Sequence, residues 1–283
     1  MIIDGRQLAN QLLATLSLEV SKLRKRSIIP SLSVILIGDN PASLSYIKQK
    51  QKAAEAVGAK LVLSNQPTAI SYQQLQQIIK GSNNDPAVHG IIIQRPLPPE
   101  AGGLQPLLLT VHPQKDVDGF VPGSPHLVPV AAAAEKILRA VSQQPSAISE
   151  DQKFYEWLHK QNIVIIGRGE TAGKPIFDHF VKLQCTPIVI TSQTPNPDAL
   201  LKEATIIISC VGKERVVTPS NISKHVILVS VGIWRDREGK LHGDYEEGEI
   251  RDIASFYTPT PGGVGPVNVA CLMQNLVTAA SNS

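Results

Sequence analysis

The sequence has few of the features that mark secreted, metal-binding or membrane proteins. Its three cysteines, Cys185, Cys210 and Cys271, are scattered over a chain of 283 residues. Such a set forms neither a disulfide framework nor a metal-ligand cluster, so we expect no metal site. No apolar run approaches the roughly 18 residues of a membrane span, and residues 1–20 lack the basic start of a signal peptide. These absences predict a cytoplasmic protein that does not enter a membrane.

The net charge is also small. The chain has 27 Lys and Arg against 24 Asp and Glu, which gives a net charge of +3. One basic cluster ends a helical pattern, where cations suit the helix dipole; it comprises Lys22, Arg24, Lys25 and Arg26. Because the sequence lacks the basic stripe of a nucleic-acid-binding protein, we expect small-molecule partners and no nucleic acid.

Short apolar runs alternate with amphipathic segments in the first half of the chain. A helical pattern from Gly5 to about Arg26 is followed by the apolar runs LSVILIG, KLVLS and VHGIIIQ. Two helical patterns separate these runs, and Ser71 and Gly81 are predicted to bound the second of them. Continuous apolar strands joined by helices are typical of a parallel sheet that is covered on both faces. The first half therefore predicts an α/β domain.

The same alternation resumes in the second half. A proline-rich stretch from Arg95 to about Pro129 and a helical pattern to about Val141 come first, followed by a surface segment, SQQPSAISEDQ. The runs NIVIIG, PIVIT, TIIISCVG and HVILVSVG then indicate further buried strands. We predict an α/β fold with two α/β domains, the second of them Rossmann-like. The last helix, VNVACLMQNLVTAA, has apolar positions that suit packing on the first domain.

A glycine-rich turn opens the second domain. Gly167, Gly169 and Gly173 lie between the run NIVIIG and the next helical pattern. Glycines there let the backbone approach a pyrophosphate, and the helix N-terminus offers free amides. The spacing G-x-G-x-x-x-G is one residue longer than the usual dinucleotide motif, and a plain tight turn is the alternative. The buried strands that follow favour a dinucleotide site.

The residues near this turn favour NADP over NAD. An NAD site usually has an acidic residue at the end of the second strand, which holds the ribose 2′-hydroxyl. Here that strand end reads VITSQT, with Thr191, Ser192 and Gln193 and no carboxylate. Arg168 lies in the turn and suits a 2′-phosphate; the alternative is an exposed loop residue.

One helix of the first domain carries three lysines. Residues 43–58, SLSYIKQKQKAAEAVG, form an amphipathic pattern with serines near its start. Residues four apart share a helix face, so Tyr46 and Lys50 form one stripe, and Lys48 and Lys52 form another. Lysines on helices are usually exposed, so a solvated face is the alternative to a chemical role.

Further polar side chains are expected at the same edge of the first sheet. Gln94 ends a predicted strand, at the carboxyl edge where open α/β sheets bind ligands. Asp116 and Asp118 lie in QKDVDGF, a turn that contains glycine. A lysine, an amide, a carboxylate and an aromatic ring suit a planar, nitrogen-rich ligand. A strand end and ordinary Asx turns are the alternative interpretations.

The motifs, taken in order, resemble those of one family. The opening IIDGRQLA is followed by GDNPASLSYIKQKQKAAEAVG, GIIIQRPLP, PQKDVDG, GRGETAGKP and TPTPGGVGPV. This ordered set spans nearly the whole chain and is far more specific than any single motif. The sequence resembles the bifunctional methylenetetrahydrofolate dehydrogenase and methenyltetrahydrofolate cyclohydrolase family. The resemblance implies NADP-dependent oxidation of 5,10-methylenetetrahydrofolate to 5,10-methenyltetrahydrofolate and its hydrolysis to 10-formyltetrahydrofolate, in one-carbon metabolism and purine biosynthesis.

The resemblance also implies roles for individual residues, and the expected catalytic set is Lys50, Tyr46, Gln94 and Asp118. Lys50 matches the family's catalytic lysine, and Gln94 matches the glutamine that hydrogen-bonds it. Tyr46 is expected to stack along the folate, and Asp118 to hold the pterin ring. The expected turn beside the same ligand comprises Pro261, Gly262 and Gly263. The implied cofactor-binding residues are Gly167, Arg168, Gly169, Gly173, Ser192, Gly232 and Ile233.

The resemblance further implies an arrangement of domains. Residues 1–138, with the C-terminal helix 266–283 packed back on them, are the expected folate-binding catalytic domain. Residues 139–265 are the expected NADP-binding, Rossmann-like domain, with the active-site cleft between the two. The family is commonly dimeric, which implies a homodimer.

Several residues depart from the family pattern, mostly on the cofactor side. Arg95 follows Gln94 directly and adds a charge, which could pair with the folate tail or disturb Gln94. The other departures are Val130, Ala131 and Ala132 in place of a cysteine-threonine-proline stretch, Gly169 for serine, Ser230 for aspartate and Asn268 for threonine.

These departures leave alternatives open. One is a cyclohydrolase whose dehydrogenase activity is weak or lost. Another is an NADP oxidoreductase of the shikimate dehydrogenase type. A third is a non-catalytic folate- or nucleotide-binding module, because a fold alone does not fix function.

Overall fold

The computed structural model describes residues 1–98, 104–142 and 150–283, which form two compact units. One, here the N-terminal unit, comprises Ala9–Pro129 and Val269–Ser283. The other, the C-terminal unit, comprises Met1–Leu8 and Val130–Asn268. The functional boundaries expected from the sequence, at 138/139 and 265/266, stay a prediction.

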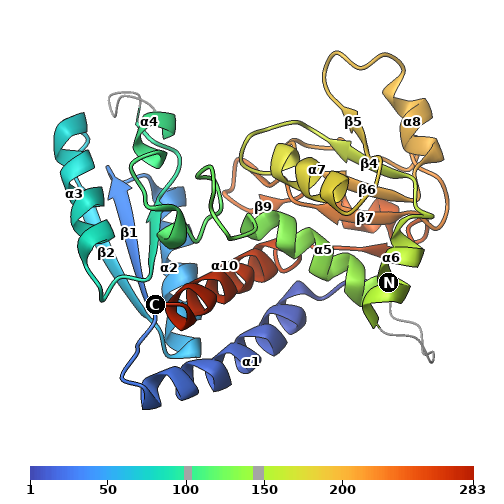
Figure 1. The fold of residues 1–283 in the computed structure, drawn as a ribbon. Helices are drawn as coiled ribbons and strands as arrows, with labels where there is room; N and C mark the ends of the chain where they lie inside the picture. Colours follow the sequence, from blue (N-terminus) through green and yellow to red (C-terminus); the bar gives the residue numbers. More distant parts are fainter. Residues whose placement is uncertain (99–103, 143–149) are drawn as a thin grey trace. The chain divides into compact units, whose positions relative to one another are not determined.

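The N-terminal unit is built on a three-stranded parallel sheet. Its strands are β1 (Ser31–Ile37), β2 (Lys60–Gln66) and β3 (Gly90–Ile93), in the order β2-β1-β3. Helices on one face are α1 (Gly5–Lys25), α2 (Pro41–Val57) and α10 (Val264–Ser281); α3 (Tyr72–Asn84) and α4 (Leu104–Leu108) cover the other (Figure 1). The expected parallel sheet between two helical layers is confirmed.

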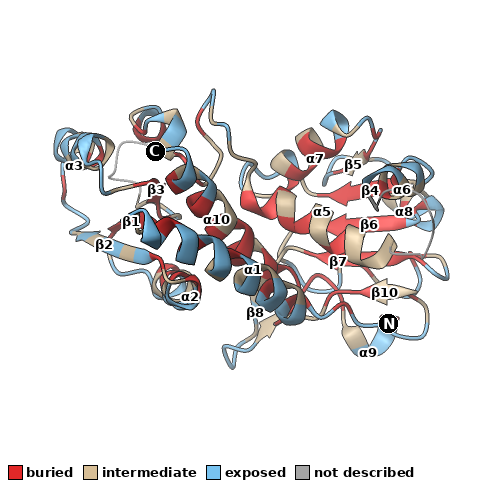
Figure 2. Ribbon diagram, turned by 60° about the horizontal axis from the view of Figure 1, so that its bottom comes forward, coloured by how far each residue is buried: buried red, intermediate tan, exposed pale blue. Residues whose placement is uncertain are grey.

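The two faces of this sheet form separate apolar cores. Leu32, Val34 and Leu36 of β1 join the core that contains α1, α2 and α10. Ile35 and Ile37 of the same strand join the core beneath α3 and α4. This double burial explains why β1 is a continuous apolar run rather than an alternating one. The outer strand β2 is far more exposed than β1 and β3 (Figure 2).

The C-terminal unit has a five-stranded parallel sheet in the order β10-β7-β6-β4-β5. Its strands are β4 (Ile163–Ile166), β5 (Ile188–Ile190), β6 (Ile206–Ser209), β7 (Ile227–Ser230) and β10 (Phe256–Tyr257). Its helices are α5 (Pro129–Ser142), α6 (Glu150–Leu158), α7 (Gly173–Lys182), α8 (Pro197–Glu203) and α9 (Glu247–Ile250). The chain turns from β5 back past β4 to β6, so the sheet has a switch point between β4 and β6.

Some helix boundaries differ from the sequence prediction. α2 begins at Pro41, because the Asn40 side chain accepts hydrogen bonds from the backbone of Ala42 and Ser43. Ser71 caps α3 as predicted, but Gly81 does not end that helix, which continues to Asn84. An exposed glycine inside a helix costs only about 1 kcal/mol, which neighbouring turns can absorb.

The apolar pattern missed the short elements. These are α4, α6, α9, β10, the 3₁₀ turn η2 (Pro113–Lys115) and a hairpin of β8 (Trp234–Arg235) and β9 (Leu241–His242). Each is too short for a helical or alternating period to develop. α6 overlaps the end of the predicted surface segment; residues 143–149 of that segment lie outside the described residues.

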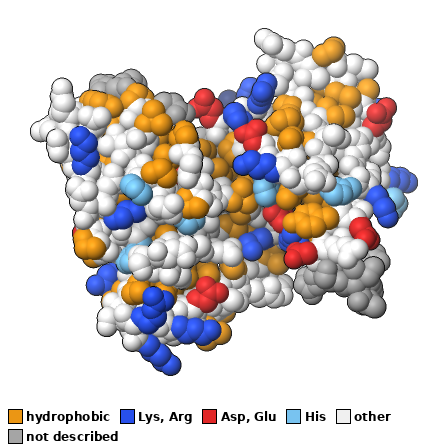
Figure 3. Space-filling model, in the orientation of Figure 1, with side chains coloured by type: hydrophobic (Ala, Val, Ile, Leu, Met, Phe, Trp, Pro, Cys, Tyr) orange, Lys and Arg blue, Asp and Glu red, His pale blue; other side chains and the backbone are white. Residues whose placement is uncertain are grey.

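The basic cluster lies at the end of α1, as expected for cations near a helix C-terminus. Lys22, Arg24 and Lys25 lie in its last turn, where Figure 3 shows Lys and Arg side chains gathered. Arg24 also donates a hydrogen bond of 2.6 Å to the carbonyl of Gly58, the residue that ends α2. Among the described helices, none is long and apolar enough to cross a membrane.

Candidate active site

Lys50 and Gln94 meet at the carboxyl edge of the N-terminal sheet. Lys50 lies on α2, which follows β1, and Gln94 directly follows β3. The Lys50 Nζ donates a hydrogen bond of 2.8 Å to the Gln94 Oε1. The chain passes from β1 to β2 on one side and to β3 on the other, so this pair lies at the switch point. Open α/β sheets bind ligands at that point.

Backbone and side-chain bonds fix the Gln94 amide. Gln94 is 7% exposed, and its Nε2 donates to the carbonyl of Arg95 at 2.8 Å. The buried Ser43 hydroxyl donates to the same carbonyl at 3.2 Å. The amide orientation therefore leaves Oε1 facing Lys50. The prediction that Ser43 lies near the helix start holds, but its hydroxyl binds the strand end rather than capping the helix.

The surroundings of Lys50 favour a neutral amine. Desolvation by burial is the main cause that lowers the pKa of Lys50 below its usual value. The Asp118 carboxylate raises this pKa, and the Arg95 guanidinium lowers it. Gln94 is neutral, so it orients the ammonium group without the stabilisation that a carboxylate partner gives to the charged form. By contrast, Lys48 and Lys52 on the other helix stripe are exposed.

Arg95 contacts Asp118 and Phe120 and does not disturb Gln94; pairing with the folate tail stays a prediction. Its Nη2 lies 3.5 Å from the Asp118 Oδ2, and its guanidinium carbon lies 3.8 Å from the centre of the Phe120 ring. Gln94 keeps its bond to Lys50 beside it. Arg95 therefore restrains the carboxylate of Asp118, which is 25% exposed and open to a ligand.

Asp116 shapes the turn that presents Asp118. Its buried carboxylate accepts hydrogen bonds from the backbone of Gly119 (3.1 Å) and Val121 (2.7 Å). Asn275 of α10 holds the same segment, donating to the carbonyl of Val117 at 2.9 Å. The turn interpretation is correct for Asp116. Tyr46 lies on α2 one turn before Lys50 and is partly exposed.

The glycine-rich turn of the C-terminal unit is tightly folded. Gly167, directly after β4, has φ +94°, which favours glycine. A Cβ on Gly173 would lie 2.1 Å from the Gly167 carbonyl oxygen, so only glycine lets α7 begin so close to the strand end. A Cβ on Gly169 would meet nothing within 4 Å. The turn therefore needs Gly167 and Gly173 for its shape, and it leaves Gly169 open.

The other predicted cofactor-binding residues lie at the same sheet edge. Arg168 and Ser192 are exposed, after β4 and β5 respectively. Gly232 and Ile233 follow β7, and Ile233 is 39% exposed. Backbone carbonyls and amides of these loops surround the switch point between β4 and β6, where a dinucleotide binds in this class of sheet.

A buried aspartate that the sequence analysis missed organises this edge. Asp244 is fully buried and accepts hydrogen bonds from the Ser209 hydroxyl (2.6 Å), the Val211 amide (3.1 Å) and the Lys213 amide (2.8 Å). Its own amide donates to the hydroxyl of Ser230 at 3.0 Å. Asp244 thus fixes the loop after β6. Its only sequence signal is a carboxylate next to glycine in HGDY, which equally suits a surface turn.

The predicted turn at residues 261–263 precedes α10. Pro261 follows a cis peptide bond, and Gly262 has φ +116°. A Cβ on Gly5 would lie 1.8 Å from the carbonyl oxygen of Gly263, so the start of α1 lies directly against this turn. No group of three or more His, Cys, Asp or Glu within the described parts of the chain could hold a metal ion.

Two family models match the chain. The tetrahydrofolate dehydrogenase/cyclohydrolase catalytic domain matches residues 3–118, and the NAD(P)-binding domain of the same family matches residues 145–283. A bifunctional protein FolD from Lactococcus lactis is 35% identical over 289 aligned residues, covering 99% of this chain and 97% of the relative. The chain belongs to this family.

Other members of the tetrahydrofolate dehydrogenase/cyclohydrolase family agree. The FolD of Geobacillus thermodenitrificans is 37% identical, covering 99% of this chain and 96% of the relative. The crystal structure of bifunctional FolD from Campylobacter jejuni superposes with a TM-score of 0.91 at 32% identity, covering 100% of this chain and 99% of that one. The resemblance stated from the motifs is confirmed, and the protein is an enzyme of the tetrahydrofolate dehydrogenase/cyclohydrolase type with an NAD(P)-binding domain.

The shikimate dehydrogenase alternative gains no support. A shikimate 5-dehydrogenase from Thermus thermophilus covers 90% of this chain and 99% of its own, with a TM-score of 0.52 and 13% identity, which shows a shared fold only. Membership of the tetrahydrofolate dehydrogenase/cyclohydrolase family rests instead on the whole chain. The departures at Gly169, Ser230 and Asn268 are therefore variations inside that family.

Proposed function

We propose that this enzyme oxidises 5,10-methylenetetrahydrofolate with NADP and hydrolyses the resulting 5,10-methenyl compound to 10-formyltetrahydrofolate. The observation that carries the second step is the 2.8 Å bond between Lys50 and Gln94 at the sheet's switch point. Supporting it are the family membership and a relative from Trypanosoma brucei whose structure was solved with NADP and an inhibitor. That relative has a TM-score of 0.90 at 27% identity, covering 100% of this chain and 97% of its own.

Lys50 is the proposed proton carrier of the hydrolysis. Burial lowers its pKa and so increases the fraction of neutral amine, which can accept a proton from the water that attacks the methenyl carbon. The new C–O bond forms as that proton leaves. Cleavage of the bond between this carbon and N5 then opens the ring: the protonated Lys50 returns its proton to N5, and the remaining hydroxyl proton leaves to solvent as the formyl C=O bond forms. Gln94 holds the amine in place throughout.

Asp118 and Tyr46 are the proposed substrate-binding residues. A carboxylate can accept two N–H groups from the edge of a pterin ring, and Asp118 is restrained for this by Arg95. Tyr46, one helical turn from Lys50, is proposed to stack along the folate. Pro261, Gly262 and Gly263 are proposed to line the same ligand with backbone groups.

The glycine-rich turn is the proposed site for the cofactor's phosphates. Its donor set fits: a shape fixed by Gly167 and Gly173, the start of α7 and the exposed Arg168 guanidinium beside it. Bound NADP supplies the hydride acceptor. Ser192, without an acidic neighbour at the end of β5, leaves room for a 2′-phosphate, and Gly232 and Ile233 are proposed to contact the nicotinamide end.

A paired absorbance assay tests this proposal. One half follows hydrolysis of 5,10-methenyltetrahydrofolate, and the other follows its formation from the methylene compound with NADP and then NAD. We expect both activities, with NADP preferred. Hydrolysis without oxidation would instead support a cyclohydrolase whose cofactor side has drifted, and neither activity would support a binding module.

The first variant to assay is Lys50→Ala. We expect hydrolysis to fall about 10²- to 10⁴-fold, the usual effect of removing a proton-transfer group. Lys48→Ala is the matched control, because Lys48 lies exposed on the same helix and should leave hydrolysis unchanged. Equal activities in the two variants would remove Lys50 from the mechanism.

The proposal also covers the protein's cellular location, oligomeric state and partners. The family resemblance supports a cytoplasmic homodimer without nucleic-acid partners, whose product is a formyl donor of the kind that purine biosynthesis consumes. Light scattering on the purified protein checks the dimer: twice the chain mass of 30.5 kDa is expected, and the single-chain mass would contradict it.

A further inference from the structure

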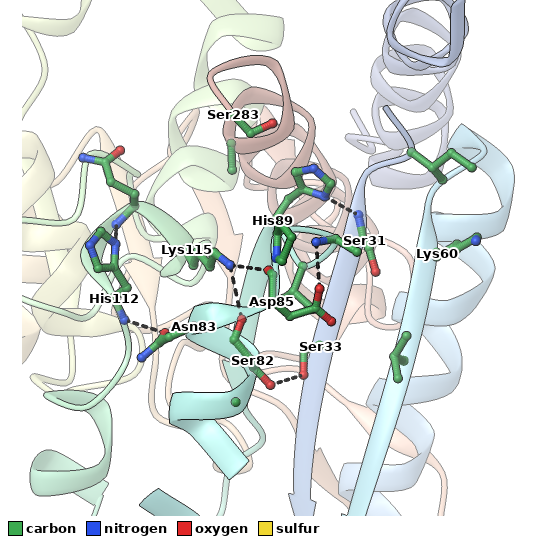
Figure 4. A pocket seen from close by; sticks show the side chains of 18 of the residues that line it. Ser31, Ser33, Lys60, Ser82, Asn83, Asp85, His89, His112, Lys115 and Ser283 are labelled. Atoms are coloured by element: carbon green, nitrogen blue, oxygen red, sulfur yellow. Dashed lines mark hydrogen bonds between the residues drawn. The ribbon is translucent and has the colours of Figure 1, made fainter. Parts of the chain in front are cut away.

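A cavity lies at the edge of the N-terminal sheet opposite to Lys50 and Gln94, where the strands begin. It has a volume of about 1300 Å³, enough for a small metabolite. The loop before β1, the first residues of β1 and β2, the end of α3 and residues 85–89 line it, together with part of the 112–126 segment and, from the chain's last residues, Ala279, Asn282 and Ser283 (Figure 4). His89 precedes β3 and Gln94 follows it, so the cavity is separated from the Lys50 site by roughly 16 Å of strand.

His89 presents an N–H group to this cavity. It is 8% exposed, and its Nδ1 accepts a hydrogen bond of 3.2 Å from the Ser31 amide. Desolvation by burial lowers the pKa of His89, and the nearby Lys115 charge lowers it further. The ring is therefore neutral at pH 7 with its proton on Nε2, so the free edge of the ring is a hydrogen-bond donor.

Lys115 lies beside His89 and is held in a fixed position. Its ammonium group donates to two carbonyl oxygens at the end of α3, those of Ser82 (3.2 Å) and Asp85 (2.7 Å). An ammonium group has three N–H donors, and the described residues offer no third acceptor to it. The remaining donor is available to a ligand in the cavity; Figure 4 shows Lys115 among the lining side chains, with its two hydrogen bonds dashed.

Further polar side chains line the cavity. The Nε2 atom of His126 is buried and has no hydrogen-bond partner among the described residues. The hydroxyls of Ser33 and Ser82 lie 3.2 Å apart in the lining. The lining side chains include two lysines and three histidines, but Asp85 is their single acidic member within the described residues, and its carboxylate already accepts from the Ala87 amide at 2.8 Å.

We propose that this cavity binds a small anionic metabolite through a phosphate or carboxylate group held by Lys115 and His89. An anion satisfies the open donors of both residues and compensates the lysine charge. The cavity exceeds the size of the anionic group alone, so the remainder of the ligand would lie along the serine hydroxyls and the apolar side chains of Val62 and Ile78. This site is separate from the proposed folate and NADP sites.

Histidine-selective NMR tests the proposal directly. The protein has seven histidines, so ring signals labelled with ¹³C can be followed one by one. Inorganic phosphate is titrated against chloride at constant ionic strength. We expect saturable shifts of the His89 and His126 signals with phosphate. The proposal would be overturned if phosphate caused no shifts of these signals, or if chloride caused shifts of the same size.

Variants separate this cavity from other places that bind phosphate. Lys115→Met should weaken phosphate binding about tenfold, the loss of one charge-assisted hydrogen bond. Lys115 also holds the end of α3, so its loss could change the fold as well as the binding. Lys60→Met provides a second test, because Lys60 is an exposed lining residue. This substitution should weaken phosphate binding without affecting folding.

The controls are Lys80→Met and Arg168→Met. Lys80 is exposed on α3 outside the lining, and Arg168 belongs to the proposed NADP site. Neither should alter the shifts of His89. The proposal would be overturned if Arg168→Met abolished the phosphate-induced shifts of His89. It would also be overturned if both Lys115→Met and Lys60→Met kept these shifts with an unchanged affinity for phosphate. No readout depends on folate chemistry, so the result is independent of the proposed function.

Discussion

At the scale of single residues, charge near Lys50 governs its chemistry. Arg95 lies beside Asp118 and lowers the pKa of Lys50, whereas Asp118 raises it. Because the neutral amine is the proposed proton acceptor, hydrolysis should rise as the pH passes through this pKa. The guanidinium therefore extends the working range of the enzyme towards lower pH.

Arg95→Met tests this effect. Removing the positive charge raises the pKa of Lys50, so the rising limb of kcat/KM for hydrolysis should move to higher pH. Arg95→Lys keeps the charge and should leave the limb near its original position. A limb that stays in place or moves to lower pH in Arg95→Met would show that the charge of Arg95 does not reach Lys50.

Strand order explains why the sequence could place Gln94 and Lys50 at one edge of the sheet. Gln94 ends a buried apolar run, and Lys50 lies on the helix after another, so parallel pairing brings them to one edge. Asp244 lacks such a signal, because its burial depends on amides of a loop about 30 residues earlier in the chain. The role of Arg95 was also open, since its partner Phe120 lies in an irregular stretch.

At the scale of elements, the glycine-rich turn joins strand and helix by close backbone contact. Ala at position 173 would place its Cβ 2.1 Å from the Gly167 carbonyl oxygen, so the start of α7 would have to shift. Gly173→Ala should cost about 1–3 kcal/mol in unfolding free energy and weaken NADP binding, as measured by denaturation and by fluorescence titration with NADPH.

Gly169→Ser is the matched control for this turn. A Cβ there meets nothing within 4 Å, and φ at this position is not in the left-handed region. We expect a stability change below about 0.5 kcal/mol and retained NADP binding. Equal losses in both variants would mean that the turn's shape does not explain its glycines.

Helices and strands were predicted correctly where the segment was long enough to show a regular pattern of apolar residues. The long helices and the buried strands were located to within a few residues. Helix ends were predicted less well. α2 begins at Pro41, earlier than the serines suggested, because Asn40 caps it, and α3 continues past Gly81 to Asn84. Two-residue strands such as β10 arise from pairing with a neighbouring strand and leave no pattern of their own.

At the scale of the whole molecule, the C-terminal helix completes the core of the N-terminal unit. Leu276 is fully buried in the core shared by α1, α2 and α10. A Cβ on Gly90 would lie 2.9 Å from its Cδ1, so α10 lies against the start of β3 without a gap.

Leu276→Ala should therefore destabilise the N-terminal unit by about 3 kcal/mol, the usual cost of a cavity left by a buried leucine. Urea denaturation followed by circular dichroism measures the change. Thr278→Ala, at an exposed position two residues later, should stay within about 0.5 kcal/mol. A similar small effect for Leu276→Ala would show that α10 is dispensable to this core.

The position of α10 at the end of the chain also affects folding during synthesis. Ala9–Pro129 leave the ribosome about 140 residues before Val269, the first residue of their last packing partner. At roughly 5–20 residues per second, the core around Leu32, Val34 and Leu36 lacks the side chains of α10 for about 7–28 s. A nascent chain in this state has α1 and α2 on this face but lacks the buried side chains of α10, so part of its apolar core is exposed to water. A messenger truncated before the codons for α10 would yield an N-terminal unit that never closes its core.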